Sequence, residues 1–158
     1  MNSELEELYQ EVILDHSRRP RIFGELADAT VRVHGDNPSC GDEIDLSVKF
    51  GDDDCLQEIK FTGHGCAISQ ASASMMTMKL KGKSPAAARE MLGAFHALVA
   101  GESDAATPLL GDLGLLRGVR KFPQRVKCAM LAWRALEGAL RQGAGEIAVS
   151  TEGDPSHA

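Results

Sequence analysis

The clearest periodic signal in the sequence is the alternation of apolar and polar residues over residues 44–50. Alternation with a period of two is typical of a half-buried β-strand. Shorter apolar patterns near residues 31–33 and 56–62 predict one strand before it and one after it, and the polar stretch Gly51–Asp54 predicts a tight turn. Because consecutive strands joined by short connections usually lie side by side, the three segments predict an antiparallel meander.

Helical spacing and capping signals predict helices before and after this meander in the sequence. Ser3 with Glu6 forms a capping box, and Ser84 followed by Pro85 is a typical helix start. Residues 101–121 are interrupted by glycines, so we expect irregular structure there, with a short helical turn near residues 113–116. The expected helices span residues 3–18, the stretch from Cys66 to Gly82, the stretch from Ser84 to Gly101, and the stretch from Pro123 to about residue 142.

The length of the chain suits a single domain. A chain of 158 residues is long enough to bury a hydrophobic core without disulfides or metals as staples. We find no internal repeat and expect one domain over residues 1–142. Residues 143–158 lack an apolar period, and we expect them to form a disordered C-terminal tail.

Composition excludes several classes of function. The net charge of −6 argues against a nucleic-acid-binding protein, which usually presents a basic face. No apolar run approaches the roughly 20 residues that span a bilayer, and the acidic N-terminus is not a secretory signal. We therefore expect a cytoplasmic protein without nucleic-acid or membrane partners. Its four cysteines then favour metal ligands or reactive thiols over disulfides.

The meander predicts which cysteines can meet. Cys40 lies in the loop that joins the first strand to the second, and the third strand returns Cys66 to that same end of the sheet. Cys55 follows the turn at the opposite end. At about 3.4 Å per residue, the strand length separates Cys55 from the others by roughly 20 Å. Cys55 is therefore excluded from a shared site.

A four-ligand metal site is the interpretation that we favour for the remaining cysteines. Cys66 falls at the start of a predicted helix, where free N–H groups stabilise a thiolate, and Cys128 lies near the start of the last helix. Together with Asp42, three thiols form a set that suits tetrahedral Zn²⁺. Arg125 and Lys127 would offset the excess negative charge of the four ligands.

Other interpretations of these residues stay open at this point. Free cysteines are often small buried hydrophobes without any ligand. His64 is a second candidate ligand, although it could equally point into solvent. Among the four ligands we expect Cys40 to depart, because it lies on a glycine-flanked loop at the edge of the sheet. A freed Cys40 thiolate could accept sulfur from the persulfide of a partner.

Four motifs in the sequence match a known family. They are Leu8–His16, the stretch Asn37-Pro38-Ser39-Cys40-Gly41-Asp42, the stretch Gly63–Ser74 that contains Cys66, and the stretch Phe122–Ala129 that contains Cys128. The chain resembles, from about residue 5 to residue 142, the SufU-type proteins. These form the zinc-containing branch of the IscU-like iron–sulfur scaffold family.

This resemblance implies an α+β fold, with a small three-stranded antiparallel sheet and helices packed on one face. It implies a Zn²⁺ site made of Cys40, Asp42, Cys66 and Cys128. It also implies a SufS-type pyridoxal-phosphate cysteine desulfurase as partner, one of whose histidines replaces a zinc ligand and frees Cys40 to accept persulfide sulfur. The sulfur then passes to a downstream iron–sulfur scaffold.

Two departures from the scaffold-type pattern favour the zinc branch. Scaffold-type members have a histidine directly before the last cysteine, where this chain has Lys127. The segment between Cys66 and Cys128 is also longer than in those members. We therefore expect a zinc-dependent sulfurtransferase. The alternatives are a scaffold that builds a [2Fe–2S] cluster on the three cysteines and a purely structural zinc module.

Overall fold

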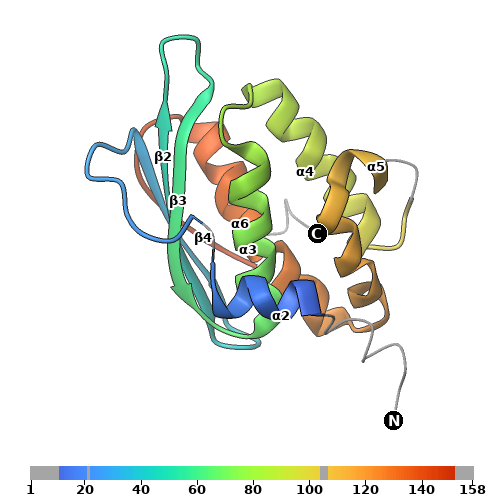
Figure 1. The fold of residues 1–158 in the computed structure, drawn as a ribbon. Helices are drawn as coiled ribbons and strands as arrows, with labels where there is room; N and C mark the ends of the chain where they lie inside the picture. Colours follow the sequence, from blue (N-terminus) through green and yellow to red (C-terminus); the bar gives the residue numbers. More distant parts are fainter. Residues whose placement is uncertain (1–10, 21, 104–106, 152–158) are drawn as a thin grey trace.

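A computed structural model describes residues 11–20, 22–103 and 107–151 of the chain. The described residues form a sheet and a set of helices, whose order is visible in Figure 1. The elements are α2 (Glu11–Arg18), β1 (Val31–Asn37), β2 (Asp42–Phe50), β3 (Leu56–His64), α3 (Ala67–Leu80), α4 (Pro85–Val99), α5 (Thr107–Leu110), the 3₁₀ helix η1 (Gly111–Lys121), α6 (Pro123–Gln142) and β4 (Gly145–Ser150).

The predicted antiparallel meander is confirmed. β1 pairs antiparallel with β2, and β2 pairs antiparallel with β3. Leu46 in the middle strand pairs with Val33 on one side and Phe61 on the other, and all three side chains are buried. Same-face neighbours of this kind are the main source of sheet stability. The alternation in the sequence therefore marks the face of the sheet that packs on the core.

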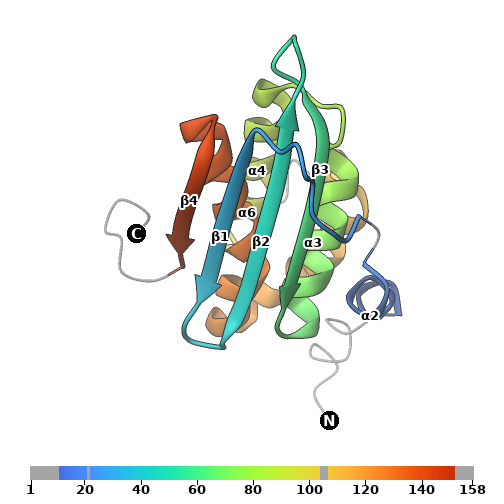
Figure 2. The same ribbon diagram turned by 90° about the vertical axis from the view of Figure 1, so that its left-hand side faces the viewer.

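The sheet has a further strand that we did not predict. β4 pairs in parallel with β1, so the strand order is β3-β2-β1-β4 (Figure 2). The expectation of a three-stranded sheet is corrected to a four-stranded mixed sheet in the described residues, and the expectation of a disordered tail is wrong for residues 145–150. Gly143 and Gly145 have φ values of 74° and 90°, which turn the chain sharply after α6. Residues 152–158 lie outside the described residues.

The helices cover one face of the sheet, as expected for the α+β class (Figures 1 and 2). α3 and α6 lie against the strands, and α4 and η1 pack on the far side of these two helices. The ring of Phe95 on α4 stacks on Trp133 of α6, with centroids 4.8 Å apart, and both side chains are fully buried. The core therefore continues from the sheet through α6 into the outer helices.

Most of the predicted helices are confirmed. α3, α4 and α6 match the expected segments, and Ser84 caps α4 by accepting a hydrogen bond from the Ala87 N–H at 3.1 Å. The first helix is confirmed for residues 11–18, and residues 1–10 lie outside the described part of the chain. None of the helices in the described ranges is long and apolar enough to cross a membrane.

The segment expected to be irregular is more regular than predicted. Residues 111–121 form one 3₁₀ helix, on which Leu113, Leu116 and Val119 are buried. A 3₁₀ helix has three residues per turn, so this spacing of three places the apolar side chains in one row. The glycines between them pointed to a loop because they lower helical propensity.

Candidate metal centre

The turn between β1 and β2 forms one side of the candidate site. The carbonyl of Asn37 accepts hydrogen bonds from the N–H groups of Cys40 and Gly41, at 3.1 and 2.8 Å. Gly41 has a φ of 74°, a left-handed conformation that glycine adopts without strain. Asp42 then pairs with Asn37 across the two strands. The tight turn thus brings Cys40 and Asp42 together at this end of the sheet.

Cys128 reaches the same point from α6. One possible ligand atom from each of Cys40, Asp42 and Cys128 lies within 4.8 Å of the other two. Asp42 and Cys128 are buried, whereas Cys40 is exposed. The structure thus brings together residues from the turn, from β2 and from α6, across 88 positions of the sequence between Cys40 and Cys128.

Cys66 joins this group from the start of α3. Its backbone N–H donates to Asp42 Oδ1 at 2.8 Å. Its thiol is hydrogen-bonded to Cys128, and this contact lowers the pKa of Cys66 to about 6 while it raises the pKa of Cys128. Backbone N–H groups of Ser69 and Ile68 lower the pKa of Cys66 further, the effect expected at a helix N-terminus. The Cys66 thiol is thus adjacent to Cys128, although the tighter group is Cys40, Asp42 and Cys128.

Gly65 makes room for the carboxylate of Asp42. A Cβ atom added at Gly65 would lie 2.2 Å from Asp42 Oδ1 and 2.7 Å from Ser69 Oγ, and the φ of Gly65 is 155°. Only glycine therefore permits Asp42 to approach the start of α3 this closely. This requirement is set by Asp42, 23 positions earlier, so it cannot be read from the local sequence around Cys66.

Asn37 is a site residue that sequence reasoning missed. Its side chain is fully buried, and Nδ2 donates to Asp42 Oδ2 at 3.2 Å and to Cys128 Sγ at 3.5 Å. Hydrogen bonds donated to a carboxylate and a sulfur stabilise their charged forms. The signal available in the sequence was an amide three residues before Cys40, next to a proline.

A buried contact fixes α3 against α6. The indole Nε1–H of Trp133 donates to Ser72 Oγ at 3.1 Å, and the Ser72 hydroxyl donates to the carbonyl of Ala129 at 2.7 Å. Ser72 and Ala129 each lie within six residues of a site cysteine, Cys66 and Cys128. The contact therefore sets the spacing of the two helices that carry these thiols.

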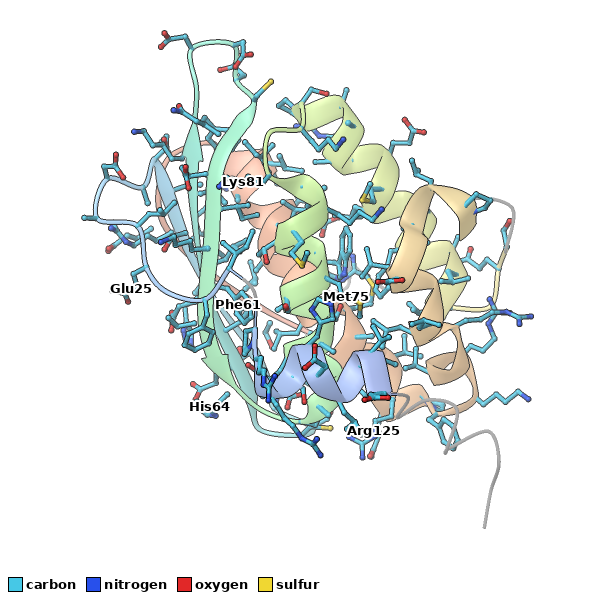
Figure 3. All side chains as sticks on the ribbon, in the orientation of Figure 1. Glu25, Phe61, His64, Met75, Lys81 and Arg125 are labelled. Carbon is cyan, nitrogen blue, oxygen red and sulfur yellow. The ribbon has the colours of Figure 1, made fainter. Side chains whose placement is uncertain are left out.

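The other candidate residues lie as follows. His64 is largely exposed and pairs with Glu43, with Nε2 and Oε2 2.7 Å apart, which favours the interpretation that it points into solvent. Cys55 follows the β2–β3 turn, at the opposite end of the sheet from the β1–β2 turn, as expected (Figure 2). Arg125 lies in the first turn of α6, at the same end of the molecule as His64 (Figure 3).

The donor set suits a thiophilic metal. Three thiols and a buried carboxylate would together carry a large negative charge, which is unfavourable in a buried position without a compensating cation. Zn²⁺ binds four ligands of this kind, and iron–sulfur clusters are also held by cysteine thiolates. The residues present therefore fit a metal, and the geometry by itself suits either group.

Comparisons with known proteins agree with this geometry. Residues 8–129 match the family described as the NifU-like N-terminal domain. The iron–sulfur cluster assembly scaffold protein IscU of Streptococcus pyogenes serotype M1 is 47% identical over 142 residues, which cover 90% of this chain and 88% of that protein. The zinc-dependent sulfurtransferase SufU of Bacillus subtilis (strain 168) is 45% identical over 144 residues, which cover 91% and 97%.

A solved structure extends the likeness to three dimensions. The crystal structure of FiSufU from the thermophilic Fervidobacterium islandicum AW-1 superposes with a TM-score of 0.80 at 37% identity, covering 88% of this chain and 99% of that one. The family match, the two relatives and the shared fold lead to one conclusion. The chain belongs to the NifU-like N-terminal domain family, which includes the IscU and SufU proteins.

Proposed function

We propose that this protein is a zinc-dependent sulfur acceptor in iron–sulfur cluster assembly, with Cys40 as the accepting thiol. The observation that carries the proposal is the contrast in exposure within the site: Cys40 is exposed, whereas Asp42 and Cys128 beside it are buried. A buried set of ligands can hold a metal while an exposed thiol on a turn reaches a partner protein. The similarity to the Bacillus SufU, which is named as a zinc-dependent sulfurtransferase, supports it.

Each ligand has a distinct part in this proposal. Asp42, Cys66 and Cys128 remain in place, because they are held by β2, α3 and α6 and by the contacts among them. Cys40 is the ligand that leaves, since it is exposed and lies on the turn between β1 and β2. Bound Zn²⁺ would keep the thiols deprotonated at neutral pH. Arg125 is proposed to offset the excess negative charge from the first turn of α6.

The sulfur-transfer step needs no external oxidant or reductant. The partner is proposed to be a SufS-type, pyridoxal-phosphate-dependent cysteine desulfurase that carries a persulfide on one of its cysteines. The Cys40 thiolate attacks the outer sulfur of that persulfide, and a new sulfur–sulfur bond forms on Cys40. The original sulfur–sulfur bond breaks, and its electron pair leaves with the thiolate of the partner. The persulfide on Cys40 then passes its sulfur to a downstream iron–sulfur scaffold.

A second candidate function is a scaffold that assembles a [2Fe–2S] cluster on Cys40, Cys66 and Cys128. The observation in its favour is the similarity to the streptococcal protein named as an IscU scaffold, at 47% identity. Lys127 argues against this function, because an ammonium group is not a cluster ligand. A [2Fe–2S] cluster is held by four protein ligands, so a cluster on three cysteines needs one further donor. Asp42 is the residue of the candidate site that is left to supply that donor.

Persulfide transfer from a desulfurase tests the proposal. We expect incubation with a SufS-type desulfurase, its pyridoxal phosphate and cysteine to add one sulfur atom to Cys40, detectable by mass spectrometry of the intact chain. Cys40→Ala should abolish both this addition and the stimulation of desulfurase turnover. Cys55→Ala is the matched control and should retain both, because Cys55 lies at the other end of the sheet.

Two results would contradict the proposal. Undiminished stimulation of the desulfurase by Cys40→Ala would exclude Cys40 as the acceptor. A stable cluster after anaerobic reconstitution with iron and sulfide, transferable to an apo-ferredoxin, would favour the scaffold function instead.

A further inference from the structure

The side chain of Asn37 has all of its polar atoms engaged inside the protein. Nδ2 contacts two of the candidate ligands, Asp42 and Cys128, as described above. Its oxygen, Oδ1, accepts a hydrogen bond from Thr151 Oγ1 at 2.9 Å. A buried amide with both ends occupied has one orientation available, because a flip would exchange its donors for an acceptor.

Thr151 reaches Asn37 through the strand that the sequence did not predict. β4 runs parallel to β1 with Val149 beside Gly35 and Ser150 beside Asp36, so the next residue lies beside Asn37. The N–H of Thr151 donates to the carbonyl of Asp36 at 3.1 Å, which extends the strand pairing to that point. Ile147 and Val149 pack against the core and hold β4 in this register.

We propose that Thr151, the residue directly after the strand β4, is a positioning residue of the metal centre that fixes the orientation of the Asn37 amide. The hydroxyl of Thr151 donates to Oδ1 while Asp42 and Cys128 accept from Nδ2, so the amide is held at both ends. Without this hydroxyl Oδ1 loses the donor that holds it, and the amide can rotate away from the Asp42 carboxylate and the Cys128 sulfur. The C-terminal strand is in this way part of the site, although it carries no ligand.

The orientation of the Asn37 amide affects how strongly the candidate ligands bind a metal. Donors that surround metal ligands fix their orientation and stabilise their anionic forms, and the loss of one typically weakens metal binding 10- to 100-fold. Asn37 donates to a carboxylate oxygen and a sulfur at once, so its orientation affects both. The part of this inference that concerns metal affinity rests on the proposed zinc function, whereas the part that concerns the amide does not.

The first test uses the metal-free, full-length chain. In the wild type we expect the side-chain NH₂ protons of Asn37 to exchange slowly with solvent in NMR spectra, because the group is buried and hydrogen-bonded. Thr151→Val removes the hydroxyl with little change in shape and should accelerate this exchange and shift the resonances. Thr151→Ser keeps the hydroxyl and should preserve them. Thr62→Val, on β3, is the control for the loss of a threonine hydroxyl from the sheet.

The second test measures zinc affinity by competition with a chromophoric chelator. Thr151→Val should weaken binding by about tenfold, whereas Thr151→Ser and Thr62→Val should stay within about twofold of the wild type. Unchanged Asn37 signals in a folded Thr151→Val protein would overturn the inference, and so would unchanged zinc affinity. If the wild type binds no zinc but Thr151→Val still frees the amide, the positioning role stands and the zinc function fails.

Discussion

At the scale of single residues, the site depends on contacts that leave almost no space between side chains. Asp42 illustrates this, because one carboxylate oxygen accepts from the N–H of Cys66 and the other from the amide of Asn37. The carboxylate also lies directly against the Cα of Gly65. The position of Asp42 is thus fixed from three sides before any metal binds.

Gly65→Ala tests this close approach. The added methyl group would overlap Asp42 Oδ1, so we expect the carboxylate to be displaced and zinc binding to fall by at least about tenfold, as for other disturbed ligand surroundings. Gly93→Ala is the matched control, because nothing lies within 4 Å of a Cβ at this exposed helical glycine. It should keep its zinc and gain roughly 0.5–1 kcal/mol of stability. Equal zinc affinity in the two variants would contradict the role of Gly65.

The solvent-exposed face of the sheet yields a pH dependence. His34 Nδ1 lies 2.8 Å from Asp45 Oδ1, and this hydrogen bond raises the pKa of His34 above its ordinary value of 6.5. The interaction of protonated His34 with Asp45 therefore stabilises the folded state fully below about pH 6.5. This contribution to the free energy of unfolding is lost as the pH rises through the folded-state pKa of His34. Both side chains are about half exposed, so the contribution is small.

NMR titration of the His34 ring checks this prediction. The midpoint should lie above 6.5 in the wild type and should fall in Asp45→Asn, because the charged partner is lost. A midpoint at or below 6.5 in the wild type would contradict the pairing.

At the scale of elements, the sequence predicted those that follow a simple period and missed those that do not. β2 was predictable because its apolar residues alternate over seven positions. β4 has only two apolar residues in phase, Ile147 and Val149, and it is a strand because β1 offers it an open edge. The apolar residues of η1 follow a period of three rather than 3.6, and its glycines lower helical propensity. Both features indicated a loop.

The same distinction applies to the site. Cys40, Asp42 and Cys66 could be placed at one end of the sheet from the sequence, because the direction of each strand determines which end of the sheet a loop occupies. Cys128 was a candidate because it lies near the start of the last predicted helix, beside Arg125 and Lys127. Asn37 and Thr151 could not be predicted, since their contact joins residues 114 positions apart through a strand whose pairing is a tertiary effect. Gly65 is visible in the sequence, but the sequence does not explain why this position must lack a side chain. The reason is the carboxylate of Asp42, which lies where a Cβ atom would be.

The contact between α3 and α6 gives a prediction at this scale. Ser72→Ala removes the acceptor of the Trp133 indole and leaves a buried N–H without its partner. We expect the free energy of unfolding of the metal-free protein to fall by about 1–3 kcal/mol, measured by urea denaturation. Met78→Ala changes a half-exposed residue on the same helix and should shift it by about 0.5 kcal/mol or less. An equal effect of the two substitutions would show that the Ser72 contact does not stabilise the helix pair.

At the scale of the whole molecule, the hydrophobic core and the candidate site lie in different parts of the fold. The helices bury one face of the sheet, while the candidate site lies at one end, where the β1–β2 turn, the start of α3 and the start of α6 meet (Figures 1 and 2). This places an exposed Cys40 at the edge of the fold, whereas the other candidate ligands are less accessible. A partner protein can then approach Cys40 without any opening of the core.

Metal content tests the central claim most directly. The protein is purified without added metal and analysed by inductively coupled plasma mass spectrometry, beside Asp42→Ala and the control Cys55→Ala. The account predicts close to one zinc per chain in the wild type and in Cys55→Ala, and clearly less in Asp42→Ala. Equal zinc in all three proteins, or iron with sulfide in place of zinc in the wild type, would contradict it.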